Sequence, residues 1–295
     1  MAMLRVRVPA TTANLGSGFD CIGAAFDWYD ELVLETSSRP GLEVVVTGEG
    51  TDQVPRDERH LVVATLLRGL DEWGGVRPGM RLTAHNTIPH SRGLGSSASA
   101  IVAGLALAWG IARPGVDLDR RELLRLSSEL EGHPDNAGAA VYGGAIWAWR
   151  HQEGVRLVEL DLHPSLSAMV WMPGFECRTD DARAVLPATV SRADAVAQAI
   201  AAAALPMALT IRPDLLLDAT GDLLHQRYRA DLMRPSYDLM ARLRETGVPA
   251  AISGAGPTVL AVADDRLLTR AEAVECAGFV RRSLDFGEGV SLTSS

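Results

Sequence analysis

The residues with the clearest capacity for chemistry form a glycine- and serine-rich segment, Pro-His-Ser-Arg-Gly-Leu-Gly-Ser-Ser-Ala, at residues 89–98. It lies between a strand-like stretch (80–85) and a long apolar stretch (98–112). Glycines let the backbone approach a ligand closely, and the unpaired N–H groups and dipole at a helix start favour an anion. The pattern therefore predicts a phosphate site, in which Ser97 could also coordinate magnesium. The alternative is a simple glycine-rich turn with Ser96 as the helix cap.

A second polar loop, Ala-Asn-Leu-Gly-Ser-Gly-Phe-Asp at residues 13–20, comes just after the first strand-like stretch. Its glycines force a tight turn and point the side chains of Asn14 and Asp20 the same way. A carboxylate in that position suits a substrate ammonium or hydroxyl group. The alternative interpretation is an ordinary turn closed by an asparagine or aspartate side chain.

A third loop, Ile-Ser-Gly-Ala-Gly-Pro-Thr at residues 252–258, separates two apolar strand-like runs. It is too polar and too rich in glycine for a core strand, and it offers several backbone N–H donors. Taken alone, the pattern fits a loop that faces a ligand and a simple hairpin turn equally well.

The composition excludes several kinds of chemistry. The 295 residues include no lysine, so all 28 basic residues are arginine. A Walker-type phosphate loop, the protein-kinase strand lysine and a pyridoxal-phosphate Schiff base each need a lysine and are excluded. The formal charge of −9 argues against general nucleic-acid binding. Phosphate chemistry in this chain must therefore use backbone N–H groups, hydroxyls and arginine.

The cysteines and the apolar runs bear on where the protein works. Cys21, Cys177 and Cys276 are odd in number and form no Cys-x-x-Cys pair, which fits a reducing compartment. The longest apolar run, 98–112, is too short to span a bilayer. We therefore expect a soluble cytoplasmic protein that contacts neither membrane nor nucleic acid.

The hydrophobic patterns predict an α+β protein with a boundary near residues 150–165. The strands are expected at 4–8, where Pro9 ends the first, and at 32–35, 42–47, 80–85, 145–150, 167–172, 250–253 and 259–262. The helices are expected at 58–73, 98–112, 118–130, 191–208, 213–219, 237–246 and 271–282.

The three loops, taken in order, resemble the signature motifs of the GHMP small-molecule kinases. Two further stretches, Glu-Gly-His-Pro-Asp-Asn at 131–136 and Thr-Asp-Asp-Ala-Arg-Ala-Val-Leu-Pro at 179–187, resemble the homoserine kinases within that family. The resemblance runs from about Arg5 to Val262. It implies a kinase that uses ATP and Mg²⁺ to phosphorylate the side-chain hydroxyl of homoserine, making O-phosphohomoserine for threonine biosynthesis. It leaves a homodimer open.

The resemblance also implies a two-domain fold. Residues 1–155 are expected to form an N-terminal ATP-binding domain with a left-handed βαβ crossover. Residues 156–295 are expected to form a ferredoxin-like C-terminal domain, with ATP and substrate in the cleft between the two.

The resemblance assigns binding roles to individual residues. A zwitterionic amino acid needs an anion for its ammonium and a cation for its carboxylate, and Asp20 and two arginines supply these charges. On its own, Arg229 would more often be a surface charge. The implied homoserine contacts are Asn14, Asp20, Asn136, Arg183, Arg229 and Gly254. The implied ATP-binding residues are Pro89, His90, Ser91, Arg92, Gly93, Leu94, Gly95, Ser96, Ser97, Ala98 and Ser99, with His60 near the adenine, where family members often have asparagine.

The implied magnesium ligands are Ser97 and a glutamate of the helix before the His-Pro-Asp-Asn motif. Alignment favours Glu129 over Glu131. The two glutamates are two positions apart on one helix, so they cannot share a face.

The general base is left open by the resemblance. Asp135 falls where mevalonate-type relatives place a catalytic aspartate, usually with a lysine partner that this chain lacks. Phosphoryl transfer through a loose transition state needs positioning more than early deprotonation. We therefore expect Asn136 to orient the substrate hydroxyl, with Asp135 as an alternative base and Thr179 in the same catalytic group.

Two rival functions remain. Another GHMP kinase, acting on mevalonate, a diphosphocytidyl erythritol or shikimate, would have no substrate ammonium for Asp20. A catalytically silent ligand sensor on the same scaffold would need no magnesium site. ADP release measured with hydroxylated amino acids and isoprenoid alcohols separates these alternatives.

Overall fold

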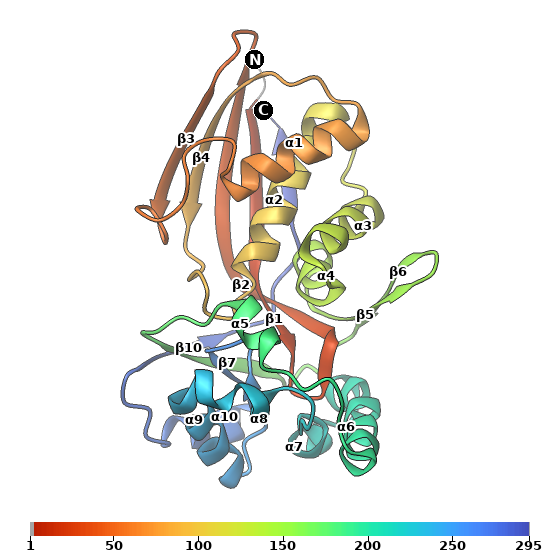
Figure 1. Cartoon of the computed structure of the whole chain (residues 1–295), viewed down its shortest axis with the longest axis vertical. Coiled ribbons are helices and arrows are strands. Elements are labelled where there is room, and N and C mark those ends of the chain that lie inside the picture. Colours follow the sequence, from red (N-terminus) through yellow and green to blue (C-terminus); the bar gives the residue numbers. More distant parts are fainter. Residues whose placement is uncertain (1–2, 295) are drawn as a thin grey trace.

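Two long neighbouring strands, β1 (Met3–Asn14) and β2 (Gly18–Ser37), form the middle of the first of two β-sheets. Leu4, Val6 and Val8 of β1 are buried and the arginines between them are exposed, as the period-two pattern predicts. The computed structural model describes residues 3–294, so the outer ends of the two predicted domains, residues 1–2 and 295, lie outside it. The two strands run the length of the first sheet towards the second (Figure 1).

The first sheet contains strands from both ends of the chain. Its order is β11-β1-β2-β4-β3, with β3 at Leu42–Gly48, β4 at Gly79–Asn86 and β11 at Ser291–Ser294. β3 and β4 are parallel, and the other pairs of this sheet are antiparallel. Two more strands extend it, β5 (Ala145–His151) on β2 and β6 (Gly154–Leu160) on β5.

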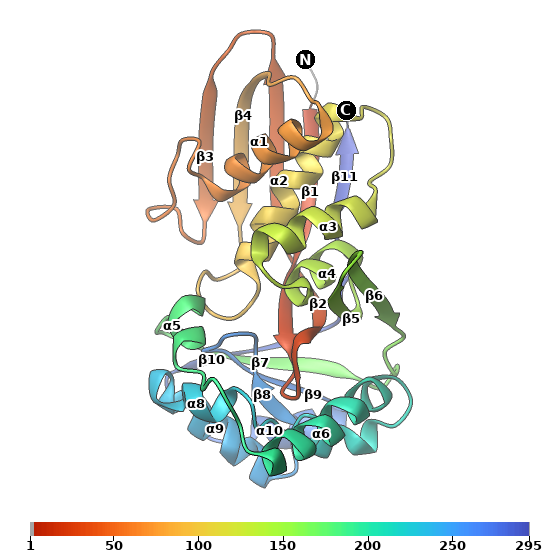
Figure 2. The same ribbon diagram turned by 45° about the vertical axis from the view of Figure 1, so that its right-hand side comes forward.

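Four helices cover one face of this sheet: α1 (Leu61–Trp73), α2 (Ser96–Ala112), α3 (Arg120–Glu131) and α4 (Pro134–Tyr142) (Figures 1 and 2). Most of α2 is buried, because it packs between α1, α3 and the strand β1. This explains why its sequence is apolar on all sides. The placement of α2 matters for function, since its first residues are the end of the glycine-serine loop.

The second sheet has the order β10-β7-β9-β8 and is antiparallel. Ala168 and Val170 of β7 face a core shared with β1 and β2, whereas Met169 and Trp171 face a separate core. The strands of this sheet are β7 (Ser167–Pro173), β8 (Ala250–Ile252), β9 (Val259–Ala263) and β10 (Phe279–Leu284).

Most of the helices of the second half pack around this second sheet (Figure 2). They are α5 (Thr179–Ala184), α6 (Arg192–Thr210), α7 (Leu216–Ala219), α8 (Gln226–Arg229), α9 (Arg234–Glu245) and α10 (Asp265–Glu272), with 3₁₀ turns at Pro213–Leu215 and Ala230–Leu232. By length and composition α6 is apolar enough to cross a membrane. One side of α6 packs against the core between the two sheets through Gln198, Leu205, Ala208 and Leu209. We therefore interpret α6 as a helix of the folded protein.

Two predictions about secondary structure are wrong. The expected last helix at 271–282 is the end of α10, a turn at Gly278, and the edge strand β10. β10 exposes Val280 and its two arginines, so its sequence lacks the alternation that marks a half-buried strand. Also, β1 does not end at Pro9 but continues beyond a bulge there, where a residue without an N–H is tolerated.

The α+β class is confirmed, and the two sheets are connected at more than one place. A division between residues 155 and 156 falls inside β6, and the C-terminal β11 returns to the first sheet. The turn between β1 and β2 in turn reaches the second half, where the Ser17 hydroxyl donates to the Ala219 carbonyl. Loops from both halves therefore meet along one cleft.

Candidate active site

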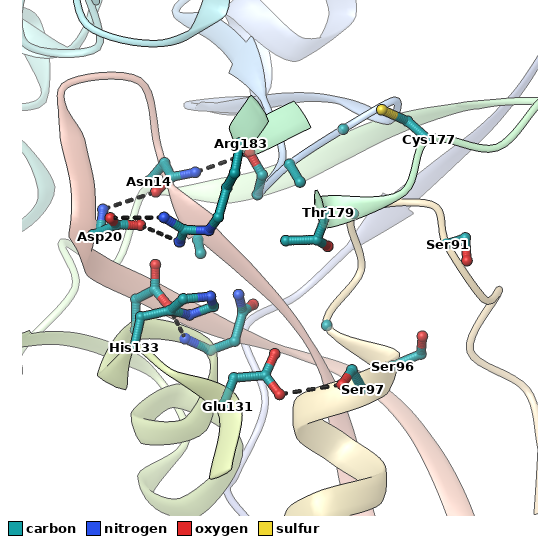
Figure 3. Close-up of a pocket in the computed structure, with 18 of the residues that line it drawn as sticks. Asn14, Asp20, Ser91, Ser96, Ser97, Glu131, His133, Cys177, Thr179 and Arg183 are labelled. Atoms are coloured by element: carbon teal, nitrogen blue, oxygen red, sulfur yellow. Dashed lines mark hydrogen bonds and ion pairs between the residues drawn. The ribbon is translucent and has the colours of Figure 1, made fainter. Parts of the chain in front are cut away.

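The cleft between the two sheets encloses about 150 Å³ and brings together all three glycine loops (Figure 3). The side chains that line it carry both signs of charge and several hydroxyls. Those lining residues are Ala13, Asn14, Asp20, Ser91, Gly93, Gly95, Ser96, Ser97, Glu131, His133, Asp135, Asn136, Cys177, Thr179, Arg183, Arg229, Gly254, Ala255 and Gly256.

The glycine-serine loop follows β4 and leads into α2, as the sequence predicts. A Cβ at Gly93 would clash with the Ser253 carbonyl, and a Cβ at Gly95 would clash with the Thr11 hydroxyl. Both glycines also have positive φ, so no other residue type fits this path. The loop therefore presents backbone N–H groups at a helix start, which is the arrangement that binds phosphate.

The loop residues divide into those that face the cleft and those that support it. Leu94 and Ala98 are buried in the core, and the buried Ser99 hydroxyl donates to the Pro9 carbonyl at 2.6 Å. Arg92 points the other way and pairs with Glu176 at 3.2 Å. The residues that line the cleft are Ser91, Gly93, Gly95, Ser96 and Ser97.

A neighbouring pocket of about 260 Å³ shares Ser91, Ser96 and Ser97 with the cleft. Its walls are largely apolar side chains such as Val54 and Val62, and it also contains His60, His90 and Asp30. Burial, together with the nearby His90, lowers the pKa of His60, and its Nδ1 atom has no hydrogen-bond partner in the described residues. A flat apolar group with polar edges fits this pocket.

Glu131, rather than Glu129, reaches the start of α2. The Ser97 hydroxyl donates to a Glu131 carboxylate oxygen at 3.1 Å, and both residues line the cleft (Figure 3). Glu129 lies on another face of α3, where it pairs with Arg125 at 3.0 Å and is half exposed. The expectation that Glu129 faces the site is therefore corrected. Residues two apart on a helix point about 200° away from each other, and the packing of α3 turns Glu131 inwards.

The Glu131 carboxylate lies in a partly dehydrated position. Burial raises its pKa, and the charge of His133 and the hydrogen bond from Ser97 oppose this only in part. Carboxylate and hydroxyl oxygens are the ligands that Mg²⁺ prefers. Among the described residues no group of three or more His, Cys, Asp and Glu side chains could hold a metal ion alone.

The first turn of α4 holds an amide and a carboxylate in fixed positions. Asp135 is buried, and one of its oxygens accepts from the Asn136 backbone N–H at 2.7 Å and lies 3.1 Å from His133 Nδ1. The Thr11 hydroxyl donates to the Asn136 Oδ1 at 2.8 Å. This bond orients the amide, so that its NH₂ group is the side that remains for a ligand.

Burial alone would lower the pKa of His133. The hydrogen bond and charge of Asp135 outweigh burial and, with a smaller contribution from Glu131, leave the pKa above its ordinary value. Asp135 and Glu131 therefore both favour the protonated form of His133. His133 belongs to the Glu-Gly-His-Pro-Asp-Asn motif, but its contact with the buried Asp135 is visible only in the structure.

Across the cleft from Ser96 and Ser97, Asp20 and Arg183 form an ion pair (Figure 3). Nη2 of Arg183 lies 2.8 Å from Oδ1 of Asp20. Arg183 comes from α5 and Asp20 from the start of β2. Burial would lower the pKa of the Arg183 guanidinium, but the bond to Asp20 outweighs it and raises the pKa. Each side chain is 38% exposed, so both charges remain accessible from the cleft.

Asn14 joins two of the three loops. Its Nδ2 donates to the Gly254 carbonyl at 2.8 Å, and its Oδ1 accepts from the Asp20 N–H at 2.9 Å. Asn14 and Asp20 both have positive φ, which asparagine and aspartate tolerate better than most residues. Both polar side-chain atoms of Asn14 thus bond within the protein, and they position Asp20 and the third loop.

Arg229 is 2% exposed and lines the cleft from α8. Its Nε donates to the Ala182 carbonyl at 2.9 Å, and its Nη1 contacts the Gly254 carbonyl and the His225 ring. Burial and the nearby charge of Arg183 lower its pKa. Two arginines and one aspartate at this end leave a net positive charge, which suits a carboxylate.

Two further residues complete the wall. Thr179 begins α5 and lies between the ion pair and Ser97, with its hydroxyl at the cleft (Figure 3). Cys177 is buried nearby, and burial raises the pKa of its thiol. Thr179 was predicted from its motif, whereas Cys177 has no motif that could have pointed to it.

Comparison with known proteins agrees with this geometry. The GHMP kinases N terminal domain family matches residues 60–144, and the GHMP kinases C terminal family matches residues 207–278. The chain is 54% identical to the homoserine kinase of Cutibacterium acnes over 97% of this chain and 98% of that one. It is 46% identical to the homoserine kinase of Mycobacterium tuberculosis over 96% and 92% of the two chains.

Solved structures show the same fold. A crystal structure of homoserine kinase from Cytophaga hutchinsonii superposes with a TM-score of 0.84 and 26% identity, covering 99% of this chain and 97% of that one. A mevalonate diphosphate decarboxylase from Enterococcus faecalis, 15% identical over the whole of both chains, has a TM-score of 0.68. The second likeness concerns the fold alone.

Proposed function

The chain belongs to the homoserine kinases of the GHMP kinase family, and from this premise we propose which of its residues perform each part of the reaction. The enzyme transfers a phosphoryl group from ATP to the side-chain hydroxyl of L-homoserine, in the synthesis of threonine. The assignment of residues depends on the position of Asp20 and Arg183 across the cleft from Ser96 and Ser97 (Figure 3), with Arg229 close to Arg183.

The charged end of the cleft binds the amino-acid part of homoserine. The substrate ammonium contacts Asp20, and its carboxylate contacts Arg183 and Arg229, whose guanidinium groups suit a carboxylate better than an ammonium would. Asn14 and Gly254 act on this end indirectly, because Asn14 bonds to both the Asp20 N–H and the Gly254 carbonyl. The side-chain hydroxyl of the substrate then points towards α2 and α4.

The other end binds ATP. The backbone N–H groups of the loop at Gly93–Ser97 surround the phosphates, and the dipole of α2 favours their negative charge. The adenine occupies the apolar pocket beside the loop, with His60 at its edge. The unpaired Nδ1 of His60 supports this placement, because a base nitrogen or amine would satisfy it.

Ser97 and Glu131 together suit a magnesium ion that is also held by the ATP phosphates. The donor set supports this, since it offers one hydroxyl and one carboxylate, and Mg²⁺ usually combines a few protein oxygens with phosphate oxygens and water. When bound, the ion neutralises charge on the phosphates during transfer. Glu131 thus replaces Glu129 as the proposed ligand.

Asn136 orients the substrate hydroxyl towards the γ-phosphate through its side-chain NH₂ group. The bond from Thr11 fixes the amide in this orientation. Asp135 is proposed to hold the Asn136 backbone in place, because its oxygen accepts from that N–H. The protonated form of His133 adds positive charge beside Asp135, and Thr179 offers a hydroxyl to the transferred phosphoryl group.

The test compares L-homoserine with two analogues that each lack one charged group. 4-Hydroxybutyrate has no ammonium and 3-aminopropanol has no carboxylate, and both keep the reacting hydroxyl. Coupled ADP release should give kcat/KM values for both analogues at least about 10²-fold below that for L-homoserine. Mevalonate serves as the substrate of the rival kinase class. Equal rates with homoserine and either analogue would contradict the assignment of the charged end.

Five broader features remain our proposals. The order β10-β7-β9-β8 supports a ferredoxin-like second domain, and the parallel pair β3 and β4 around α1 is where the left-handed crossover is expected. We also propose two functional domains with a boundary near residue 155. The C-terminal strand β11 belongs to the first domain, because it pairs with β1. A cytoplasmic location and a homodimer are also proposed, the second to be tested by light scattering.

A further inference from the structure

His225 is fully buried directly behind Arg229, and it does not line the cleft. It caps the start of the short helix α8, four residues before Arg229. His225 lies outside the five sequence motifs, and it has no role in the proposed reaction. Its hydrogen bonds nevertheless connect the two charges that recognise the substrate.

The two ring nitrogens of His225 have partners that determine its protonation. Nδ1 lies 3.1 Å from Arg229 Nη1, and a guanidinium can only donate, so Nδ1 accepts. Nε2 lies 2.9 Å from the Gly16 carbonyl oxygen, which can only accept, so Nε2 carries the proton. The ring is therefore neutral, with its single proton on Nε2.

The charges around the ring agree with this state. Burial lowers the pKa of His225, the charge of Asp222 opposes it, and Arg229 adds to it, with smaller contributions from Gly16 and Asp20. Asp222 lies 3.5 Å from Nε2, but its carboxylate already accepts three backbone N–H groups, those of residues 224–226. A second proton on the ring would point at the Arg229 guanidinium.

The same ring also holds the turn that carries Asp20. Phe19 stacks on His225 with ring centroids 4.8 Å apart and an interplanar angle of 17°. Gly16 lies in the turn between β1 and β2, and Phe19 and Asp20 follow it at the start of β2. His225 therefore contacts Arg229 with one edge and the Asp20 turn with its other edge and its face.

We propose that His225 is a positioning residue that, through its contact with Arg229 Nη1, holds the Arg229 guanidinium at a fixed distance from the Asp20 carboxylate. It touches no substrate, and it makes the enzyme selective for a ligand whose ammonium and carboxylate have the spacing found in an α-amino acid. This inference rests on the proposed function, in which Arg229 contacts the substrate carboxylate.

Two substitutions test separately the bond of His225 to Arg229 and its bond to Gly16. His225→Asn keeps an acceptor oxygen near the position of Nδ1, and His225→Gln keeps a donor near the position of Nε2. Both remove the ring, so the loss of stacking is the same. We expect His225→Gln to raise the KM for homoserine about tenfold, while His225→Asn stays within about threefold of the wild type. In both variants kcat and the KM for ATP should stay within about twofold.

The outcomes distinguish this inference from the function on which it rests. Arg229→Ala is the reference, and an unchanged KM for homoserine in that variant would show that the proposed carboxylate site is wrong. If Arg229→Ala raises this KM but His225→Gln does not, only the positioning role is wrong. Equal losses in His225→Asn and His225→Gln, or a matching rise in the KM for ATP, would also overturn it.

A measurement on the wild-type protein covers the case in which a variant does not fold. ¹⁵N NMR of the labelled histidines reports which ring nitrogen carries the proton. We expect the His225 signals to show protonated Nε2 and unprotonated Nδ1 at neutral pH. A proton on Nδ1 would exclude the bond from Arg229 and with it the positioning role.

Discussion

Arg183 donates to both carboxylate oxygens of Asp20, with Nη2 2.8 Å from Oδ1 and Nη1 3.3 Å from Oδ2. The two residues come from different halves of the chain, and the pair connects α5 to the start of β2 across the cleft. In the proposed function the same two groups contact the ammonium and the carboxylate of homoserine. The substrate therefore finds its charge partners already placed opposite each other, and they are not left unpaired in its absence.

Removing one member of this pair should weaken homoserine binding selectively. Arg183→Ala is expected to raise the KM for homoserine at least about tenfold, because a carboxylate loses a charged donor. Arg183→Lys should also be poor, since an ammonium cannot reproduce the planar fork. Steady-state rates with each substrate varied in turn provide the measurement. An unchanged KM for homoserine together with a collapse in ATP affinity would contradict the assignment.

Substitutions of Ser97 and of two glutamates on α3, Glu131 and Glu129, test the proposed metal site. Ser97→Ala and Glu131→Gln should each lower kcat by about 10²-fold or more, since each removes a ligand that helps to neutralise charge in the transition state. Glu129→Gln is the matched control and should stay near wild-type activity, because Glu129 pairs with Arg125 on an exposed face of α3. Circular dichroism should show that all three variants fold. An inactive Glu129→Gln beside an active Glu131→Gln would restore the assignment from alignment.

The pH profile of kcat, rather than the size of the rate loss, shows whether Asp135 acts as a base or only positions Asn136. A lost base and a misplaced Asn136 could both cost about 10²–10⁴-fold. We expect Asp135→Asn to keep measurable activity and the same acidic limb in kcat as the wild type, because the hydroxyl proton passes to the phosphoryl group. Asn136→Ala should be at least as damaging. An acidic limb that disappears in Asp135→Asn, with a residual rate rising with hydroxide, would identify Asp135 as the base.

The thiol of Cys21 should resist alkylation at neutral pH. Burial, helped by the charges of Asp135 and Asp20, raises its pKa to about 11. A raised thiol pKa means that the reactive thiolate appears only at higher pH, so at pH 8 about one molecule in a thousand carries it. Iodoacetamide labelling followed by peptide mass spectrometry should show a rate that increases about tenfold per pH unit from 7 to 9. A rate that already begins to level off near pH 9 would show an ordinary thiol.

Much of the site could be predicted from the sequence because its main parts are local. The positive φ at Gly93 and Gly95 can be adopted freely only by glycine, so a glycine-rich loop before a long apolar helix defines its own shape. The turn that carries Asn14 and Asp20 is less local, because these two residues themselves have positive φ and Asn14 donates to the Gly254 carbonyl. The glycine-serine loop needs mainly its own residues to present its N–H groups.

The tertiary structure decided which residues meet. Glu129 and Glu131 are equally good candidates on a helix read alone, and only the burial of Leu123 and Leu126 against the core turns Glu131 towards Ser97. The pairing of Asp20 with Arg183 and the contact of His225 with Gly16 join residues 163 and 209 positions apart. Hydrophobic periodicity describes one element at a time, and it contains no information on how two elements are oriented around a shared core. The relative placement of the charges that recognise the substrate is therefore a property of the packed fold.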